Sequence, residues 1–316
     1  MSENCTRLVK GEFFLNDSGL TLSPKENNVF HTRFLEYLVF SLNDIIFGLG
    51  RGTAQKNLDV DAFRCLQIQY PKSLAEQDRI VGILDEAFAG IAAATAHAEQ
   101  NLHNARELFQ SVLQSTFSQK GEDGEYQKVS NIADHCLGKM LDKRKNQGKP
   151  QEYLRNKNVR WFDFNLDDLL EMKFEDDEQE RYSAQKDDVL ICEGGYPGRA
   201  AIWESDEPIY FQKAIHRVRF HEPVFNKWFV YFLYHSDFTG DLRTHFTGAG
   251  IQHFTGKALA DFEIPVGSTT KIKEHVTKLD ALSEEIKALE AIYERKQSAL
   301  AELKQSLLRK AFAGEL

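Results

Sequence analysis

The chain has 316 residues, enough for two or three domains, and its 42% hydrophobic and 28% charged residues are typical of a globular protein with a sizeable core. The formal net charge of −9 argues against a uniformly basic nucleic-acid-binding protein, although binding depends on where basic residues cluster. The first residues lack the apolar core of a secretory signal, and no uninterrupted apolar run is long enough to span a membrane. The four cysteines lie far apart, which argues against disulfides and a zinc site. Together these features predict a cytoplasmic protein without a membrane partner.

Two long amphipathic helices are predicted, over residues 73–122 and 268–316. Apolar residues recur at steps of three and four from Ile80 to Val112, and again, with interruptions, from Ile272 to Leu307. Such seams require an apolar partner along their length, so we expect the two helices to pair antiparallel as a coiled coil. Two ordinary core helices are the alternative.

Residues 123–267 predict one globular unit of mixed strands and helices. Two segments have helical periodicity, Leu166–Met172 and Phe225–Phe246. Strands are predicted where β-branched and aromatic residues concentrate or alternate, over Val159–Phe164, Asp188–Glu193, Arg199–Trp203, Ile209–Phe220 and Asp261–Val266.

An internal repeat relates the two ends of the chain. Gln110–Phe117 (QSVLQSTF) resembles Gln305–Phe312 (QSLLRKAF), 195 residues later, and Gly52–Ile68 aligns with Gly248–Ile264 at an offset of 196. The order is the same in both copies, which indicates a duplicated module of one globular unit followed by one long helix. In the first copy, residues 1–72 match only the C-terminal portion of the unit, including a helix over Arg33–Phe47. Missing strands would leave exposed edges and apolar surface there.

Basic residues concentrate before and within the predicted strand at 159–164. Eight basic and two acidic residues lie between Lys139 and Arg160, whereas Asp163–Glu180 carries nine acidic residues and one lysine. The loop KRKNQGKP is either a solvated, mobile loop or a set of phosphate contacts. Arginine and asparagine can read guanine and adenine edges, so YLRNKNVRW adds candidates for base contact. The candidates here are Lys143, Arg144, Lys145, Lys149, Arg155, Asn156, Asn158 and Arg160.

The segment CEGGYPGRAAIW predicts a tight turn after an apolar strand. Gly194 and Gly195 would offer backbone N–H groups, and Arg199 a guanidinium, to phosphates or base edges. The alternative is an ordinary hairpin turn with Arg199 in a surface ion pair. In FQKAIHRVRF, alternation predicts a basic strand face with Lys213 and Arg217, while His216 is expected to be a hydrogen-bonded structural histidine.

A catalytic constellation is not found in the sequence. GxxxxGK[ST], HExxH, GxSxG and Asn-Pro-Pro-aromatic motifs do not occur, and the paired acids at 167–168 and 176–177 fit a solvated loop better than a nuclease centre. We therefore expect a non-catalytic chain that binds no cofactor itself.

The sequence resembles a known family at this point. YLRNKNVRW, CEGGYPGRAAIW, FQKAIHRVRF and FTGAGIQHFTG (Phe246–Gly256) look like the target recognition domain of type I restriction–modification specificity (S) subunits. Leu74–Phe88 resembles the family's central helix, and Leu303–Leu316 resembles its C-terminal helix. The resemblance implies an α+β fold, with target recognition domains of mixed sheet and helices joined by two long antiparallel coiled-coil helices.

The same resemblance implies the partners. Double-stranded DNA would be read at a bipartite site, with the helices as a ruler and as a docking surface for DNA methyltransferase (modification) subunits. Restriction/translocase subunits would join, and S-adenosylmethionine, ATP and Mg²⁺ would be bound by the partners. Residues 1–72 would be the C-terminal remnant of a first recognition domain, residues 73–122 the central helix, residues 123–267 a complete recognition domain and residues 268–316 the paired helix.

The missing half of the first recognition domain leaves several alternatives open. The chain could come from a truncated or split gene or a misplaced start, or it could be a half-subunit that forms a homodimer through the long helices. Two rival functions are a coiled-coil assembly scaffold without sequence readout and an autonomous endonuclease or methyltransferase.

Overall fold

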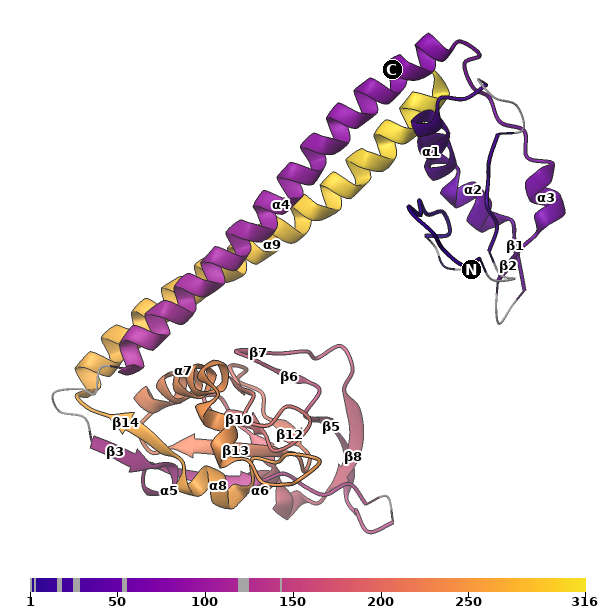
Figure 1. Ribbon diagram of the computed structural model, residues 1–316. Coiled ribbons are helices and arrows are strands. Elements are labelled where there is room, and N and C mark those ends of the chain that lie inside the picture. The colour runs from indigo at the N-terminus through magenta and orange to yellow at the C-terminus, as the bar shows by residue number, and fades with distance from the viewer. Residues whose placement is uncertain are drawn as a thin grey trace. The chain divides into compact units, whose positions relative to one another are not determined.

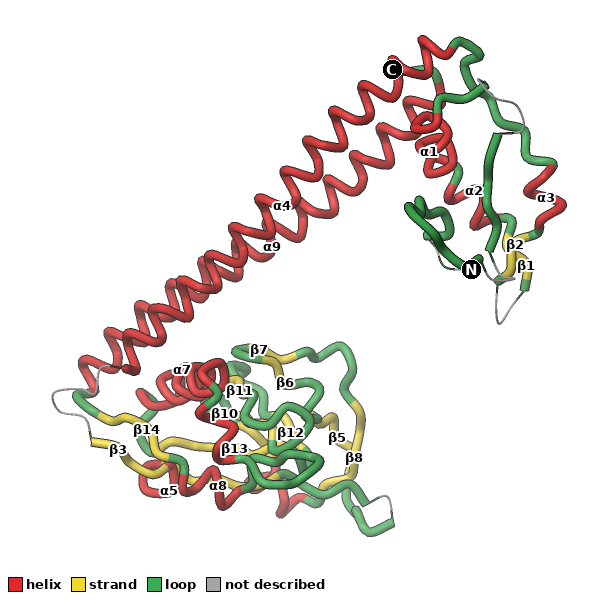
Figure 2. The backbone as a smooth tube through the Cα atoms, in the orientation of Figure 1, coloured by secondary structure: helices red, strands yellow, loops and turns green. Residues whose placement is uncertain are grey.

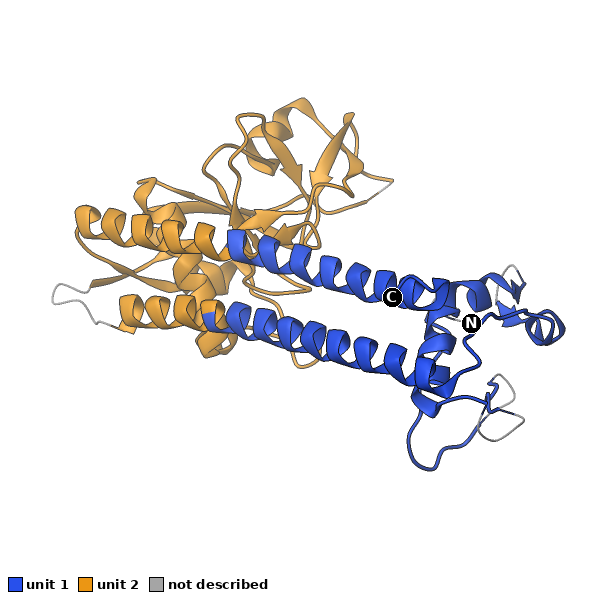
Figure 3. Cartoon of the chain, turned by 90° about the horizontal axis from the view of Figure 1, so that it is seen from above, with its two compact units in different colours: residues 1–104, 287–316 blue, residues 105–286 orange. Residues whose placement is uncertain are grey.

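The computed structural model describes residues 2, 4–15, 19–24, 29–52, 56–118, 125–142 and 144–316. The chain divides into two compact units, which Figure 3 colours separately: residues 1–104 with 287–316 form unit 1, and residues 105–286 form unit 2. Two 45-residue helices, α4 (Leu74–Ser118) and α9 (Thr269–Ala313), contribute to both units. They correspond to the two long helices predicted from the apolar seams.

Helices α4 and α9 pack in opposite directions. In unit 1, Ile80 and Leu84 near the start of α4 share a buried cluster with Leu308 and Ala311 near the end of α9. In unit 2, Leu113 near the end of α4 shares a cluster with residues from the start of α9. The predicted antiparallel pairing is therefore confirmed within each unit.

Helix α4 is long and apolar, and few of its residues are fully buried. An 18-residue window of this helix has a mean hydropathy of 1.3, yet only 17% of the window is buried. By length and composition alone this helix, among the described residues, could cross a membrane, which is weak evidence because soluble helices pass the same test. Between Ile80 and Ala98 the exposed apolar residues are glycines and alanines, whereas the large apolar side chains are buried or half-buried.

Unit 1 contains short elements beside its parts of α4 and α9 (Figure 1). Its aromatic core joins Phe34 to Phe312, with ring centroids 5.2 Å apart. The helix predicted over Arg33–Phe47 is broken in two. The elements are α1 (Thr32–Ser41), α2 (Asn43–Gly48), β1 (Gly50–Arg51), β2 (Asn57–Leu58) and α3 (Val60–Arg64).

Unit 2 is built on two four-stranded sheets with strand orders β11-β10-β13-β4 and β8-β5-β12-β9. Figure 2 shows the helices and strands of this unit linked by long loops. Helix α7 packs on the first sheet, where the rings of Phe220 and Phe229 are 5.2 Å apart. Its strands are β3 (Glu125–Lys128), β4 (Ala133–Leu137), β5 (Lys149–Leu154), β6 (Val159–Arg160), β7 (Asp163–Phe164), β8 (Leu170–Phe174), β9 (Ser183–Ala184), β10 (Val189–Cys192), β11 (Ala200–Ile202), β12 (Ile209–Phe211), β13 (Ile215–Phe220) and β14 (Glu263–Val266). Its helices are α5 (Val129–Ile132), η1 (Asp176–Glu178), α6 (Gln179–Tyr182), α7 (Val224–Thr239), η2 (Asp241–His245) and α8 (Gly256–Asp261).

Several predicted elements of unit 2 differ from the structure. The predicted strand Ile209–Phe220 is two strands in different sheets, β12 and β13, separated by a turn in which Ala214 has φ +83°. The predicted helix over Leu166–Met172 is wrong, because this segment runs into β8. Its apolar residues at steps of three and four can also belong to a turn followed by a strand, and pairing with β5 decides for the strand.

The repeat predicted from the sequence recurs in the contacts. The strand pair Arg51↔Asn57 in unit 1 matches the bridge Thr247↔His253 in unit 2, at an offset of 196. At the same offset, Asp59 caps α3 by accepting from the Ala62 N–H, and Thr255 caps α8 by accepting from the Ala258 N–H. The two copies are therefore related in structure as well as in sequence.

A side-chain clamp is also repeated. In unit 1, Arg33 and Tyr37 on α1 both bind Asp85 of α4. In unit 2, Lys227 and Tyr231 on α7 both bind Asp280 of α9, at distances of 2.8 and 2.7 Å. Helix α1 therefore docks on α4, the next long helix in the chain, in the same way that α7 docks on α9.

Candidate nucleic-acid interface

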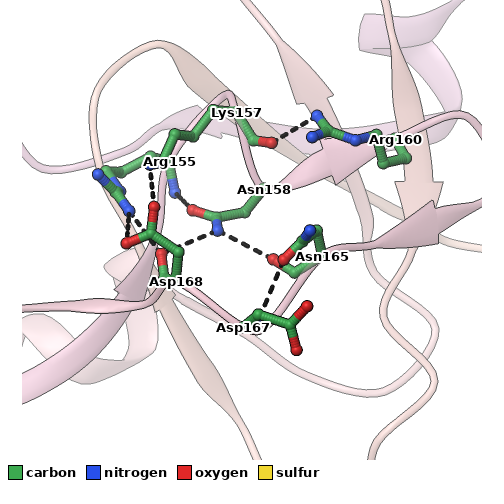
Figure 4. A network of polar contacts seen from close by, with 7 residues as sticks. All are labelled: Arg155, Lys157, Asn158, Arg160, Asn165, Asp167 and Asp168. Carbon is green, nitrogen blue, oxygen red and sulfur yellow. Dashed lines mark hydrogen bonds and ion pairs between the residues drawn. The ribbon is translucent and has the colours of Figure 1, made fainter. Parts of the chain in front are cut away.

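The loop between β5 and β6 is shaped by a buried asparagine. Asn158 is 1% exposed; its side-chain oxygen accepts from the Arg155 N–H at 2.9 Å, and its amide donates to the Asn165 carbonyl at 2.9 Å. Figure 4 shows these contacts closing the loop on itself. Since the polar atoms of Asn158 are used internally and the side chain is covered, Asn158 holds the loop and does not present an edge to DNA. Its predicted DNA contact is corrected on this ground.

Two cations of this loop share one acidic partner (Figure 4). Asp168 forms an ion pair with Arg155 at 3.0 Å and another with Lys157. Hydrogen bonds from Lys157 and Arg155 hold the pKa of the Asp168 carboxyl below its usual range. Arg155 and Lys157 are thus partly neutralised in the free protein.

Arg160 has a different environment. Its side chain is exposed, and its guanidinium donates to the backbone carbonyls of Lys157 and Val159 rather than to a carboxylate. Backbone acceptors orient the guanidinium without cancelling its charge, so Arg160 remains a strong candidate for an anionic ligand.

The glycine-rich turn links β10 to β11, as predicted. Cys192 N–H donates to the Arg199 carbonyl at 2.8 Å, and Gly198 N–H donates to the Cys192 carbonyl at 2.9 Å. Gly195 has φ +79°, and a Cβ built there would lie 2.3 Å from Nδ2 of Asn156. The turn therefore needs glycine at 195 both for its backbone conformation and for close approach.

Asn156 joins the turn to the β5–β6 loop. Its side-chain amide donates to the Gly194 carbonyl at 3.0 Å, and its own carbonyl accepts from Nη2 of Arg199 at 3.2 Å. The Arg199 guanidinium lies 4.9 Å from the ring centre of Tyr196. Among the residues that the structure describes, Arg199 has no ion-pair partner; it bridges two loops instead.

Lys213 lies beside the same loops. Gln212 N–H donates to the Leu154 carbonyl at 3.1 Å, and Glu193 N–H donates to the Ala214 carbonyl at 2.8 Å. The turn that carries Lys213 is therefore fixed to the end of β5 and to the start of the glycine turn. Lys213 is exposed.

Arg217 does not face solvent, contrary to the prediction from alternation. It is 8% exposed, and its Nη1 donates to the backbone carbonyls of Glu180 and Ser183, each at 2.8 Å. The basic strand face expected from alternation does not exist because β13 is a central strand, between β10 and β4, and is covered on both faces. Arg217 is a structural residue.

The basic loop before β5 lies apart from these residues. Lys149 and Arg155 flank β5 at opposite ends, which corresponds to about 20 Å for an extended strand of this length. Arg144 and Lys145 are exposed, Lys149 pairs with Asp176 at 3.0 Å, and Lys143 lies outside the described residues. The exposed positions of Arg144 and Lys145 are compatible both with a solvated loop and with phosphate contacts.

Sequence reasoning missed several residues of this surface. Tyr196 is 45% exposed beside Arg199, and its hydroxyl donates to Asp237 at 3.3 Å. The hairpin at 247–253 is fixed to the glycine turn by the Phe254 N–H, which donates to the Glu193 carbonyl at 2.8 Å, and its tip carries Ile251, 75% exposed. The segment Phe246–Gly256 is recognisable as a motif, but its local sequence does not indicate which loop it contacts.

His216 and Cys192 of this unit are buried. His216 accepts or donates at Nε2 to the Phe254 carbonyl at 3.0 Å and is 1% exposed, which confirms its structural role. Burial lowers the pKa of His216 to about 4 and raises the pKa of the Cys192 thiol to about 11. Within the described ranges, three or more His, Cys, Asp or Glu side chains do not come together as a metal site.

The structure thus brings some of the predicted DNA-contact residues together and separates the others. One surface carries Gly195, the loop cations and the turn lysine; its members are Arg155, Asn156, Arg160, Gly195, Arg199 and Lys213. Gly194 is buried beside them, so its predicted DNA contact is wrong. We call this set the loop surface.

Comparisons with known proteins agree with this architecture. Residues 6–102 match the family model of the type I restriction modification DNA specificity domain. A search of curated proteins finds no match.

Two solved structures have a similar fold. A chain from a structure of the assembly and conformational transition of the type I R-M system is 18% identical with a TM-score of 0.74, covering 90% of this chain and 71% of that one. The HsdS subunit from Thermoanaerobacter tengcongensis is 18% identical with a TM-score of 0.53, covering 90% of this chain and 70% of that subunit. The resemblance inferred from the motifs is confirmed: residues 6–102 match the model of the type I restriction modification DNA specificity domain, and the chain shares the α+β fold of these two solved structures.

Proposed function

We propose that this chain is the DNA specificity subunit of a type I restriction–modification complex and that unit 2 reads one half of a bipartite target through the loop surface. The observation that carries the proposal is the convergence of three chain-distant segments on one side of a domain with this fold. Asn156 joins the β5–β6 loop to the glycine turn between β10 and β11, and the turn that carries Lys213 is the third segment.

The chemistry of the loop surface suits duplex DNA. Arg160 and Lys213 offer exposed cations to phosphates, whereas Arg199 and Asn156 are held rigidly at the junction of two loops. Preorganised arginine and asparagine side chains are suited to bidentate contact with guanine and adenine. The negative net charge does not oppose this, since the cations are concentrated locally.

The partners follow from the fold and from the exposed helix. The exposed residues of α4, among them several glycines and alanines, support docking of a DNA methyltransferase subunit, with a restriction subunit joining that assembly. In this proposal the chain itself performs no chemistry; S-adenosylmethionine, ATP and Mg²⁺ belong to the partners. The proposed site of action is the cytoplasm.

The proposal is tested by methylation mapping. The chain is expressed with the modification subunit encoded beside it, and host DNA is sequenced by a method that detects N6-methyladenine. A symmetric interrupted motif is expected if the chain dimerises through its helices, and an asymmetric two-part motif if a second recognition domain is supplied. A new motif should disappear with Arg160→Ala and persist with Lys186→Ala, a matched exposed cation that pairs with Asp206.

A negative result is also informative. If both proteins are soluble and associated but no new methylation motif appears, sequence readout is ruled out. The coiled-coil scaffold, or an inactive split subunit, then replaces the proposal.

A further inference from the structure

The hairpin at 247–253 ends in a tip that the domain leaves uncovered. Thr247 and His253 pair through two backbone hydrogen bonds of 2.9 and 2.8 Å, and the five residues between them are all exposed. In this tip Ile251 is 75% exposed, more than any other large apolar side chain in the described part of unit 2; Met140, at 59%, comes next. Single exposed apolar residues are common on protein surfaces, so the exposure of Ile251 gains meaning only from its position and its support.

The base of the hairpin lies beside the loop surface. A Cβ built on Gly194 would lie 3.0 Å from Nδ1 of His253, and the carbonyl of the same glycine accepts from the Asn156 amide at 3.0 Å. Ile251 lies two residues before His253, and two residues of chain span at most about 7 Å. The tip therefore lies next to the side chains proposed to contact bases.

A glycine holds the tip in one conformation. Gly248 has φ +111°, and a Cβ built there would lie 2.1 Å from the carbonyl oxygen of Ile251. The backbone of the tip thus closes tightly on itself, and only glycine fits at position 248. Such a preorganised tip can present the Ile251 side chain without the entropic cost of ordering a loop on binding.

Unit 1 repeats the frame of this hairpin with a different residue at the tip. At the offset of 196, the strand pair that closes the hairpin recurs, and Gly52 has φ +110°, nearly the angle of its counterpart in unit 2. In the sequence, Gln55 takes the position of Ile251; its structure lies outside the described residues. A retained frame with a changed tip residue is the pattern expected of a position that reads different bases in the two copies.

The apolar tip matches one chemical feature of duplex DNA. The 5-methyl group of thymine is the apolar group that base edges present in the major groove. The asparagine and arginine side chains of the loop surface also match major-groove edges. A wedge between base steps in the minor groove is the other use of an exposed isoleucine, and these polar neighbours favour the major groove over it.

We propose that Ile251 is a specificity-determining residue that contacts the 5-methyl group of one thymine in the half-site read by unit 2. The assignment rests on the proposed function, since it requires that the loop surface faces DNA. Because the glycine turn fixes the base of the hairpin, Ile251 and Asn156 read neighbouring base pairs.

The test compares thymine with deoxyuridine, which lacks only that methyl group. The full chain with its modification subunit is titrated with duplexes of the mapped target, in which each thymine is replaced in turn by deoxyuridine. In the wild type, one replacement should weaken binding about 4-fold, the effect of leaving one methyl group in water. Ile251→Ala should bind the thymine duplex more weakly and should show no further loss at that position.

Met140→Ala is the matched control, because Met140 is a large, exposed apolar side chain on the loop before β5, apart from the loop surface. This variant should keep the full ratio between the affinities for the thymine and deoxyuridine duplexes. The exposure of Ile251 also predicts that Ile251→Ala unfolds at the same temperature as the wild type, which separates a lost contact from a lost fold.

Two results overturn the assignment while the proposed function stands. In one, the wild type binds its target specifically but no deoxyuridine weakens binding. In the other, the deoxyuridine effect persists in Ile251→Ala, which assigns the methyl contact to another residue. A chain that binds no specific target overturns the assignment together with the proposed function, so the two failures are distinguishable.

Discussion

Asp168 limits the positive charge that the β5–β6 loop presents. It pairs with both Arg155 and Lys157, while the Asp168 carbonyl separately accepts from Arg155 and Asn158. The carboxylate and the backbone therefore have different roles: the backbone shapes the loop, and the carboxylate balances its charge. The Lys157–Asp168 pair is exposed on both sides, and such pairs are weak, so a phosphate can displace the carboxylate from Lys157.

Replacing the carboxylate should strengthen DNA binding. In Asp168→Asn the backbone contacts remain, Lys157 is released and the covered Arg155 loses its counter-charge, so we expect about 3- to 10-fold tighter binding to non-specific duplex DNA at low salt. Fluorescence anisotropy with a labelled duplex measures this. The matched control is Asp206→Asn, which frees one exposed lysine, Lys186, away from the loop surface. Equal gains in DNA affinity in the two variants would contradict the assignment of the β5–β6 loop to the DNA interface.

His216 links stability to pH. The folded protein holds it buried with a pKa of about 4, below its usual 6.5, so its contribution is fully present above pH 6.5 and is lost as the pH falls toward 4. Between pH 7 and pH 5 we expect a loss of about 2 kcal/mol from this residue.

Urea unfolding of the wild type and of His216→Gln at both pH values isolates this term. The variant is expected to start less stable but to lose less stability on acidification, because it has no imidazole to protonate. A loss in the variant equal to that of the wild type would assign the pH dependence to other groups.

At the scale of elements, the loop surface depends on close approach between two loops. Asn156 reaches the glycine turn only because Gly195 has no side chain. Local sequence predicted both the turn and the polar loop, since Gly-Gly and Pro-Gly are strong turn signals. It did not predict that Asn156 and Arg199 meet, because that contact forms between residues 43 positions apart.

Gly195→Ala should separate the two loops. The added Cβ would stand 2.3 Å from the Asn156 amide, and alanine at φ +79° is itself strained. We expect a loss of about 1–3 kcal/mol in the free energy of unfolding and weaker binding to the cognate site.

The control for this variant is Gly240→Ala. Gly240 has φ +87° but nothing within 4 Å of a built Cβ, so it carries the backbone strain alone. If Gly195→Ala and Gly240→Ala lower stability and DNA binding equally, the effect comes from backbone strain alone and the contact between Asn156 and the glycine turn contributes nothing.

Strand position explains the largest error at this scale. Alternation in FQKAIHRVRF suggested a solvent-facing row with Lys213 and Arg217. The turn at Ala214 moves Lys213 out of the strand, and the neighbours β10 and β4 make β13 interior. Period-two patterning cannot tell a half-exposed strand from one covered on both faces, because neighbouring strands and layers come from distant sequence.

At the scale of the whole molecule, local charge and net charge have opposite signs. The chain carries −9 overall, yet Arg160 and Lys213 are exposed on the loop surface. A specific DNA contact through few cations should give a modest salt dependence that individual substitutions reduce measurably.

Arg160→Ala and Lys213→Ala should each lower the slope of log K against log salt by about 0.9, if each neutralises one phosphate. Titrations across a series of salt concentrations provide the slopes. Lys186→Ala should leave the slope unchanged. A slope unaffected by all three variants would move the DNA contact away from the loop surface.

The sequence by itself determined the elements and relations that depend on local pattern. The long helices followed from their apolar seams, the glycine turn from its composition, and the duplication from two stretches that recur at offsets of 195 and 196. Each of these signals is complete within one segment or one alignment, so no knowledge of packing was needed.

Only the tertiary structure decided which polar residues are available to a ligand. Asn158 and Arg217 have the residue types of DNA contacts, yet their hydrogen bonds are made inside the domain. Arg160 and Lys213 have the same chemical character and remain exposed. The physical reason is that burial and hydrogen-bond satisfaction depend on chain segments that are distant in sequence and adjacent in space.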